Sequence, residues 1–179
     1  MNNTPTLCGR HAAPERLEAR IAPATLVNPK VVTYMDIDGD LVTVKMTKGT
    51  FDDAFTNFIF APLGIGEVLQ EIDLQAEAFH GTKLSITAKP QGGQGNGFVN
   101  IGEISAPGRH LGAITVRGDV GRVSAGSSNV PGIGVKSLTV ESLGELGVLT
   151  QAPGGNLVTQ IDGGLGKLTV KTNIREASI

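Results

Sequence analysis

Between Ile101 and Val170, the hydrophobic positions repeat one short pattern: an aliphatic residue, glycine, any residue, and a second aliphatic residue. Near three copies stands a triplet in which two aliphatic side chains flank a threonine. Because successive side chains of a strand point to opposite faces, each triplet predicts a strand with one apolar and one hydroxyl-bearing face. The pattern occurs at residues 101–104, 111–114, 120–123, 143–146, 146–149 and 165–168, and the triplets at residues 114–116, 138–140 and 168–170.

The glycines of this pattern indicate how the strands are connected. Glycine has no Cβ, so it can take a positive φ at a corner or let neighbouring backbone approach closely. Short strands between such corners predict an all-β fold, and specifically a parallel β-helix (solenoid). Since one strand cannot bury its apolar face alone, its coils must stack on one another. An antiparallel β-sandwich with glycine-rich turns has short strands at similar spacing and remains the alternative.

The patterns divide the chain into three segments. Residues 1–29 are polar and contain four prolines, which predicts a disordered tail with a short helix at residues 14–20. Residues 30–97 form a β-hairpin and capping region, and residues 98–179 the solenoid repeats, which we expect to continue beyond residue 179. Strands are also expected at residues 69–74 and 83–89, the second with Leu84, Ile86 and Ala88 facing inward.

The clearest local prediction is a hairpin whose strands flank Asp38-Gly39. This dipeptide suits a two-residue type I′ turn, which would place Met35 opposite Val42 and Thr33 opposite Val44.

Phenylalanines at residues 51, 55 and 58 have helical spacing, whereas residues 58–60 resemble a strand, and both interpretations stay open. In either case, we expect these rings to cap one end of the solenoid.

Composition excludes several classes of function. The 15 Lys and Arg and 17 Asp and Glu are dispersed, so the sequence lacks the basic stripe of a nucleic-acid-binding protein. No run of about 18 apolar residues predicts a membrane span, and the first 24 residues lack the apolar core of a secretory signal. Cys8 is the only cysteine, so no internal disulfide can form. Many glycines and no tryptophan favour a narrow core over a deep ligand pocket.

The candidate metal ligands are Asp36, Asp38 and Asp40, whose carboxylates alternate along the hairpin turn. Carboxylate oxygens suit Ca²⁺, the one cofactor that the sequence suggests. The segment lacks the remaining spacing of a helix-loop-helix calcium site, and Asp-Gly is also ordinary turn chemistry. Two hypotheses therefore remain for this segment: a Ca²⁺ site and an ordinary turn.

No catalytic residues are predicted. Parallel β-helices include carbohydrate-active enzymes that use paired carboxylates, and a charged cluster offers candidates for that chemistry. A solvated outer face explains this cluster better, because only analogy of fold supports catalysis and Phe98 is the only aromatic residue nearby. The histidines at residues 11, 80 and 110 are isolated in sequence, and residues 91–97 suit a flexible connection. The charged candidates are Glu103, Arg109, Arg117, Asp119 and Arg122.

Residues 16–24 read Arg-Leu-Glu-Ala-Arg-Ile-Ala-Pro-Ala. This segment resembles the Leu-Glu-Pro-Arg signature (the LEPR-XLL type) near the N-terminus of large envelope-associated proteins of planctomycete-type bacteria. Ala19 stands where the signature has proline, and residues 21–24 stand where its leucine-rich end is expected. The resemblance implies an exported or cell-surface protein.

Together these features predict a non-catalytic structural or adhesive β-solenoid segment of an exported, cell-surface bacterial protein. Its expected partners are cell-envelope components or carbohydrate, with coil-to-coil self-association. One alternative is a carbohydrate-active enzyme, a polysaccharide lyase or hydrolase, whose catalytic coils would follow residue 179. A calcium-stabilised adhesion module is a third hypothesis.

Overall fold

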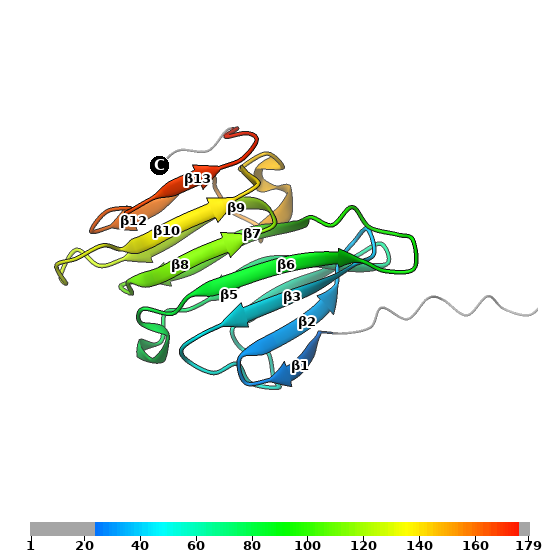
Figure 1. Ribbon diagram of the computed structural model, residues 1–179, viewed down its shortest axis with the longest axis horizontal. Coiled ribbons are helices and arrows are strands. Elements are labelled where there is room, and N and C mark those ends of the chain that lie inside the picture. Colours follow the sequence, from blue (N-terminus) through cyan, green and yellow to red (C-terminus); the bar gives the residue numbers. More distant parts are fainter. Residues whose placement is uncertain (1–23, 176–179) are drawn as a thin grey trace, which may run out of the picture.

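Two facing β-sheets make up the fold in a computed structural model, which describes residues 24–175 (Figure 1). Sheet A has the order β1 (Thr25–Asn28), β2 (Val31–Met35), β3 (Asp40–Met46), β6 (Leu84–Pro90), β8 (Leu111–Val116), β10 (Val135–Val140) and β13 (Leu168–Val170). Sheet B has the order β11 (Ser142–Leu143), β9 (Gly118–Gly126), β7 (Val99–Pro107), β5 (Gly66–Asp73) and β4 (Phe58–Leu63), and β12 (Gln160–Asp162) also pairs with β9. Two 3₁₀ turns complete it, η1 (Glu77–Phe79) and η2 (Gly147–Thr150). The all-β prediction is confirmed.

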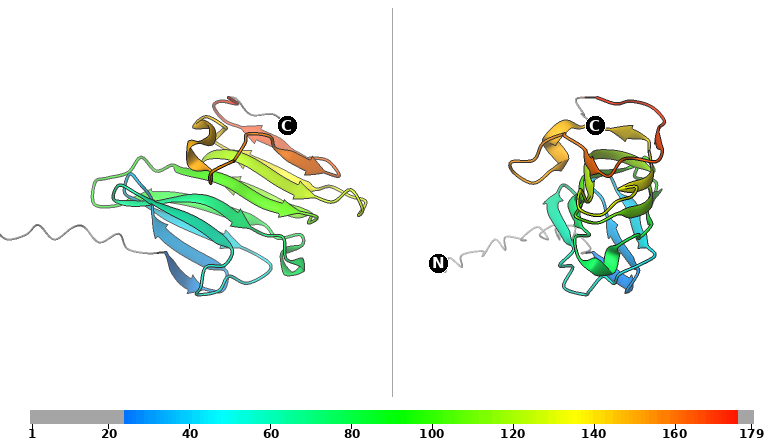
Figure 2. Two further views of the ribbon diagram at one scale, coloured as in Figure 1. Left: turned by 180° about the vertical axis from the view of Figure 1, so that it is seen from behind. Right: turned by 90° about the vertical axis from the view of Figure 1, so that its left-hand side faces the viewer.

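Both sheets are mixed in strand direction. The pairs β1–β2, β2–β3, β3–β6 and β4–β5 are antiparallel, whereas β6–β8–β10–β13 and β5–β7–β9–β11 are parallel. From β5 onward the chain passes back and forth between the sheets, which face each other in Figure 2. A uniformly parallel β-helix is therefore not what the sheets show, because short hairpin loops fold the first strands back on themselves. The wholly antiparallel sandwich is not found either.

The aliphatic-Thr-Val triplets lie on neighbouring strands of sheet A. Leu84 of β6 pairs with Ile114 of β8, Ile114 with Leu138 of β10, and Leu138 with Leu168 of β13. We call these four residues the A column. Leu84, Ile114 and Leu138 are at most 1 % exposed, while Leu168 on the last strand is partly exposed. The expectation that the triplets bury their apolar faces against one another is thus met on β8 and β10 and only partly on β13, while Leu84 of β6 extends the same buried column.

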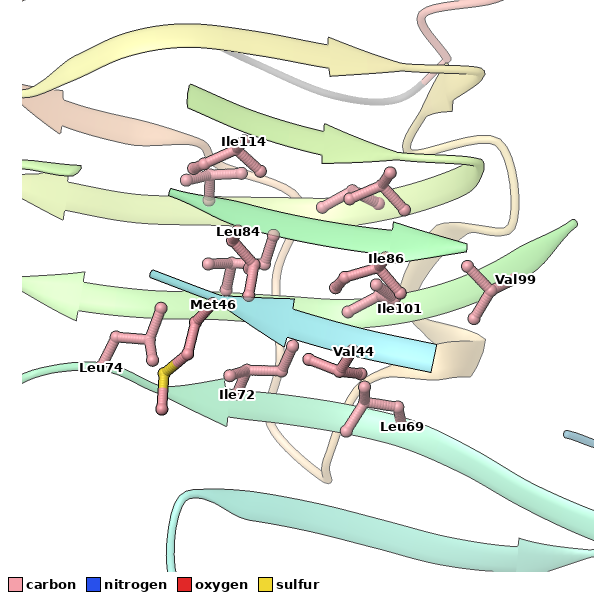
Figure 3. Packing of buried hydrophobic residues seen from close by; sticks show 14 of the residues in the cluster. Val44, Met46, Leu69, Ile72, Leu74, Leu84, Ile86, Val99, Ile101 and Ile114 are labelled. Carbon is pink, nitrogen blue, oxygen red and sulfur yellow. The ribbon is translucent and has the colours of Figure 1, made fainter. Parts of the chain in front are cut away.

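Sheet B supplies the opposite wall of the core with a matching register. Leu69 of β5 pairs with Ile101 of β7, Ile101 with Val120 of β9, and Val120 with Leu143 of β11, and all four are fully buried. We call these residues the B column. Figure 3 shows side chains of the two sheets meeting between them. The core is therefore built from aliphatic columns that run across the strands.

The outer face of sheet A has its own column, of hydroxyl groups. Ser85, Thr115, Thr139 and Thr169 occupy paired positions on β6, β8, β10 and β13. Ser85 and Thr115 are exposed, and the two others are half-buried. This hydroxyl row follows from the triplets, because a strand that turns its aliphatic side chains inward turns the residue between them outward.

The β2–β3 hairpin forms as predicted, but its register differs by one residue. Met35 pairs with Leu41 and Tyr34 with Val42, so Tyr34 and Val42 point into the core, where the predicted register left Tyr34 on the polar face. Three residues, rather than two, connect the strands, because the Asp36 amide donates to the Asp40 carbonyl and Gly39 takes a φ of 98°. The extra loop residue reverses the face that each side chain of β2 occupies, whereas Val42 and Val44 of β3 stay on the apolar side.

Gly102 and Gly121, two glycines of the repeated pattern, lie within strands and allow neighbouring segments to approach closely, rather than forming corners between strands. A Cβ on Gly102 would come within 2.4 Å of the carbonyl oxygen of Thr150, and one on Gly121 within 2.7 Å of Gln151 Nε2. Both contacts come from residues 144–159, which we call the insert. It leaves sheet B after β11 and returns at β12. Only Leu143 of the sequence copies at residues 143–149 belongs to a strand, β11; the rest enter a turn and η2, where Leu149 is 87 % exposed.

The phenylalanines gather beside β4, and the strand interpretation of residues 58–60 is confirmed. Phe58 lies 4.7 Å from Phe51 and 5.6 Å from Phe60 between ring centroids, and Phe60 contacts Tyr34 at 5.0 Å. The strands predicted at residues 69–74 and 83–89 correspond to β5 and β6, with Leu84, Ile86 and Ala88 buried.

The segment predicted as a tail contains β1 at its end. The helix predicted at residues 14–20 and most of the signature-like segment at residues 16–24 lie outside the described residues. Between residues 24 and 175, no helix is long and apolar enough to cross a membrane.

Candidate functional site

The three predicted metal ligands share the loop between β2 and β3, which we call the carboxylate loop (residues 36–40). Asp36 Oδ1 accepts hydrogen bonds from the backbone amides of Asp38, Gly39 and Asp40 at 3.3, 3.1 and 2.8 Å. Asp40 Oδ2 accepts two more, from the amides of Asn96 and Gly97. Residues 91–97, expected to be a flexible connection, thus close over the loop. Five backbone amides fix the positions of the carboxylates.

The three carboxylates of this loop lie close together. One oxygen from each of Asp36, Asp38 and Asp40 lies within 4.8 Å of the other two. Burial raises the pKa of Asp36 to about 7, with the Asp38 carboxyl adding to the rise and the Asp40 amide opposing it. None of the ion pairs within residues 24–175 includes any of the three. The loop therefore brings three carboxyl groups together without an ion pair to any of them in the described structure.

A calcium ion fits this arrangement of oxygens. Ca²⁺ binds oxygens at 2.3–2.6 Å, so two ligands of one ion lie at most about 5 Å apart. Asp40 is fully buried, and Oδ1 of both Asp38 and Asp40 is without a hydrogen-bond partner in the described part of the chain. An ion would supply partners for these oxygens and neutralise the charge. The carboxylate loop could thus hold Ca²⁺ through three side chains, with the remaining ligands from water.

A second charged group lies on the outer face of sheet B, where the insert covers part of the strands. Glu71, Glu103 and Arg122 pair in register across β5, β7 and β9, and we call them the charged row. Arg122 Nη2 lies 2.6 Å from Glu103 Oε2. The row and the insert residues 151–155 line a cleft of about 190 Å³. Glu103 and Arg122 were predicted from the sequence as candidates for catalysis. Glu71 was not, because only strand register brings it beside them.

The other charged candidates do not join this row. Arg109 pairs with the exposed Glu77 at 2.8 Å, and Arg117 lies over the Phe98 ring at 5.6 Å. Asp119 is buried and accepts hydrogen bonds from the Ser142 hydroxyl and from two amides of the insert. These contacts give each of the three side chains a place in the fold. The structure brings together only two of the five candidates for catalysis.

The histidines that are far apart in sequence lie side by side in the structure. The rings of His80 and His110 are 5.6 Å apart between centroids, while His11 lies outside the described residues. No acidic side chain is in hydrogen-bond contact with either ring in residues 24–175. The pair has no geometry of a catalytic or metal-binding histidine site.

Comparison with known proteins gives no relative from which a function could be inferred: no protein-family model, curated protein or solved structure matches this chain.

Calcium binding to the carboxylate loop would be revealed by thermal stability. We expect Ca²⁺ to raise the Tm relative to an EDTA-treated sample, because it removes the repulsion among three buried or half-buried carboxylates. Asp38→Asn removes one ligand charge and should abolish the increase, whereas the exposed Asp53→Asn control should retain it. Differential scanning calorimetry with and without Ca²⁺ measures both. An unchanged wild-type Tm and no heat on calcium titration would rule the metal site out.

The charged row predicts a dependence of stability on pH. Burial raises the pKa of Glu71 above its ordinary value of 4.5, and the negative charge of Glu103 adds to the rise, while Ser105 and Arg122 oppose it. The native state therefore holds this proton more tightly than the unfolded state does. Its stabilising effect is present below pH 4.5 and is lost as the pH rises through the native pKa.

Urea unfolding of the wild type and Glu71→Gln from about pH 4 to pH 8 tests this sign. The glutamine variant should gain stability relative to the wild type as the pH rises, while Asp53→Asn should show no such gain. A wild type that gains on the variant with rising pH would mean that Arg122, rather than burial and Glu103, dominates the environment of Glu71.

Proposed function

We propose that this chain is a non-catalytic structural and adhesive segment of a bacterial cell-surface protein, which binds carbohydrate or other envelope components through an extended, shallow face. The observation that carries the proposal is the hydroxyl row on sheet A. Lys45 of β3 pairs with Ser85, so the row continues onto a positively charged side chain. It lies on the sheet that the insert does not cover.

The chemistry of this row suits a repetitive polar partner. Neighbouring strands lie about 4.8 Å apart, so the hydroxyls recur at that interval across the sheet. Lys45, Ser85 and Thr115 of this face line an open hollow of about 290 Å³. Each hydroxyl donates one hydrogen bond and accepts others, as the hydroxyls of a sugar chain do. A polysaccharide could therefore contact several positions at once, each weakly, and gain affinity from their number. The lysine at the end of the row favours an acidic polymer.

We infer that the parallel strands from β5 to β13 form the coils of a β-solenoid, and that the antiparallel strands β1–β4 cap its first coil. Support comes from the in-register A and B columns and from the regular alternation of the chain between the two sheets. Stacked coils give a rigid rod whose faces repeat, which suits a stalk or an adhesive surface.

Location at the cell surface is proposed on the resemblance of residues 16–24 to the envelope-protein signature. A low aromatic content and the net charge of -2 are compatible with this assignment. Self-association between coils is proposed because β13 is the last described strand of sheet A. Among the described strands it pairs only with β10, so its other edge is open to pairing with a further coil.

The enzymatic alternative has one observation in its favour. Glu71 and Glu103 are adjacent carboxylates beside a cleft, and paired carboxylates are the groups that cleave glycosidic bonds. The ion pair between Glu103 and Arg122 holds one of them in place and argues for a structural role. The experiment below distinguishes the two functions.

Affinity electrophoresis through gels that contain alginate, pectin or hyaluronan tests the adhesive face. We expect at least one acidic polysaccharide to slow the wild type, and the double substitution Thr115→Val with Thr139→Val to remove the effect. Valine keeps the shape of threonine and favours strands, so the fold should persist. Thr50→Val, at an exposed loop position away from the row, is the matched control and should migrate like the wild type.

The same polysaccharides are then assayed for cleavage products. No new reducing ends and no unsaturated sugars should appear. Products that form with the wild type and disappear with Glu103→Gln would replace the adhesive function with the enzymatic one. Migration unaffected by every polysaccharide, or equally affected in the double variant, would contradict the role of the hydroxyl row.

A further inference from the structure

A cavity of about 320 Å³ lies between the insert and the β4–β5 hairpin. This volume is within the range of small-molecule sites in proteins. Val68 lies in its wall and alternates with Leu69 of the B column, so the cavity is on the outer side of sheet B. It is thus separate from the hydroxyl row of sheet A.

Aliphatic side chains form the walls and mouth of this cavity. Leu63 comes from the β4–β5 hairpin, Ile37 from the carboxylate loop, and Leu146 and Leu149 from the insert. All four are large apolar residues that are exposed to solvent, and the exposed fraction is 58 % for Leu63 and 87 % for Leu149. Exposed aliphatic groups collected around one hollow indicate a surface that is covered when a ligand binds.

The polar groups of the cavity are acidic or neutral. Asp36 and Glu67 are its two charged residues, and none of the described residues that line it is basic. Oε2 of Glu67 is buried and lacks a hydrogen-bond partner within residues 24–175. Thr150 is 6 % exposed, and its hydroxyl likewise lacks a partner there. A buried oxygen without a partner is costly, so these atoms favour a ligand that donates hydrogen bonds.

We propose that this cavity binds a small amphipathic organic cation, whose apolar body packs against the aliphatic walls while its ammonium group contacts Glu67. The ammonium donates to the free oxygens of Glu67 and Thr150 and balances the negative charge of the cavity. An anion would meet two carboxylates, and a neutral alcohol would leave their charge uncompensated. The mixture of walls and charges therefore selects against both.

Three probes with one bicyclic body and different head groups test the proposal by isothermal titration calorimetry. They are 1-naphthylmethylammonium, 1-naphthalenemethanol and 1-naphthoate, used with EDTA so that no metal occupies the carboxylate loop. We expect the ammonium to bind about tenfold more tightly than the alcohol, and the carboxylate to bind most weakly. This order distinguishes charge recognition from burial of the apolar body alone.

Glu67→Gln removes the charge and keeps the shape, so it should bring the ammonium close to the affinity of the alcohol without weakening the alcohol. Leu149→Lys adds a positive charge at the exposed mouth and should weaken the ammonium selectively. Glu77→Gln, on η1 beside Arg109, is the control and should bind all three probes like the wild type. Circular dichroism verifies that each variant is folded.

Equal affinities for the ammonium and the alcohol, or a selectivity that survives Glu67→Gln, would overturn the proposal. So would a dimer in sedimentation velocity that Leu149→Lys dissociates, because a second copy of the chain would then cover the aliphatic rim. Failure of polysaccharide binding by sheet A would leave this site untouched, since the two sites use opposite sheets.

Discussion

The structure depends on the burial of aliphatic columns between two sheets that face each other. No single strand of this chain has enough apolar surface to be stable alone, and most strands contribute only two or three inward side chains. In-register pairing turns these small contributions into continuous A and B columns. Every other feature of the molecule, including both outer faces, is positioned by this register.

The outer faces of the two sheets differ in the residues that point outward and in whether the insert covers them. On sheet B, glycines at residues 102 and 121 leave space that backbone and side chain of the insert occupy. Sheet B thereby acquires two hollows. Residues 146, 149 and 150 of the insert line the cavity, and residues 151–155 line the charged cleft. On sheet A, threonine and serine stand at the corresponding outward positions and stay accessible. Sheet B therefore offers a cavity and a cleft beside the insert, and sheet A an open, repetitive row of hydroxyl groups.

Local patterns in the sequence were sufficient for much of the fold. The triplets predicted three strands of sheet A, β8, β10 and β13, and the residues that these strands turn inward, since alternation is a property of the strand itself. The carboxylate loop was also predictable, because its three aspartates are close in sequence. The hairpin register was not, since it depends on the amides that Asp36 and Asp40 bind, and two of these come from residues 96 and 97.

Long-range arrangement explains the other errors. Leu146-Gly147-Val148-Leu149 has the same pattern as the strand segments, yet it forms η2 outside the core, because the pattern does not specify a partner. Glu71 was not predicted as part of the charged row, because its neighbours Glu103 and Arg122 come from other strands. Of the antiparallel pairs, only the β2–β3 hairpin was predicted; β1–β2, β3–β6 and β4–β5 were missed, because short apolar strands look alike in sequence whichever direction their neighbours run.

Urea unfolding of a matched pair of leucine variants tests the dependence of the fold on its columns. Leu138 lies in the middle of the A column with no exposed surface, whereas Leu149 on the insert is 87 % exposed. The account predicts that Leu138→Ala lowers the free energy of unfolding by about 2–5 kcal/mol, and that Leu149→Ala changes it by less than about 0.5 kcal/mol. Equal losses from the two substitutions, or a larger loss from Leu149→Ala, would contradict the account.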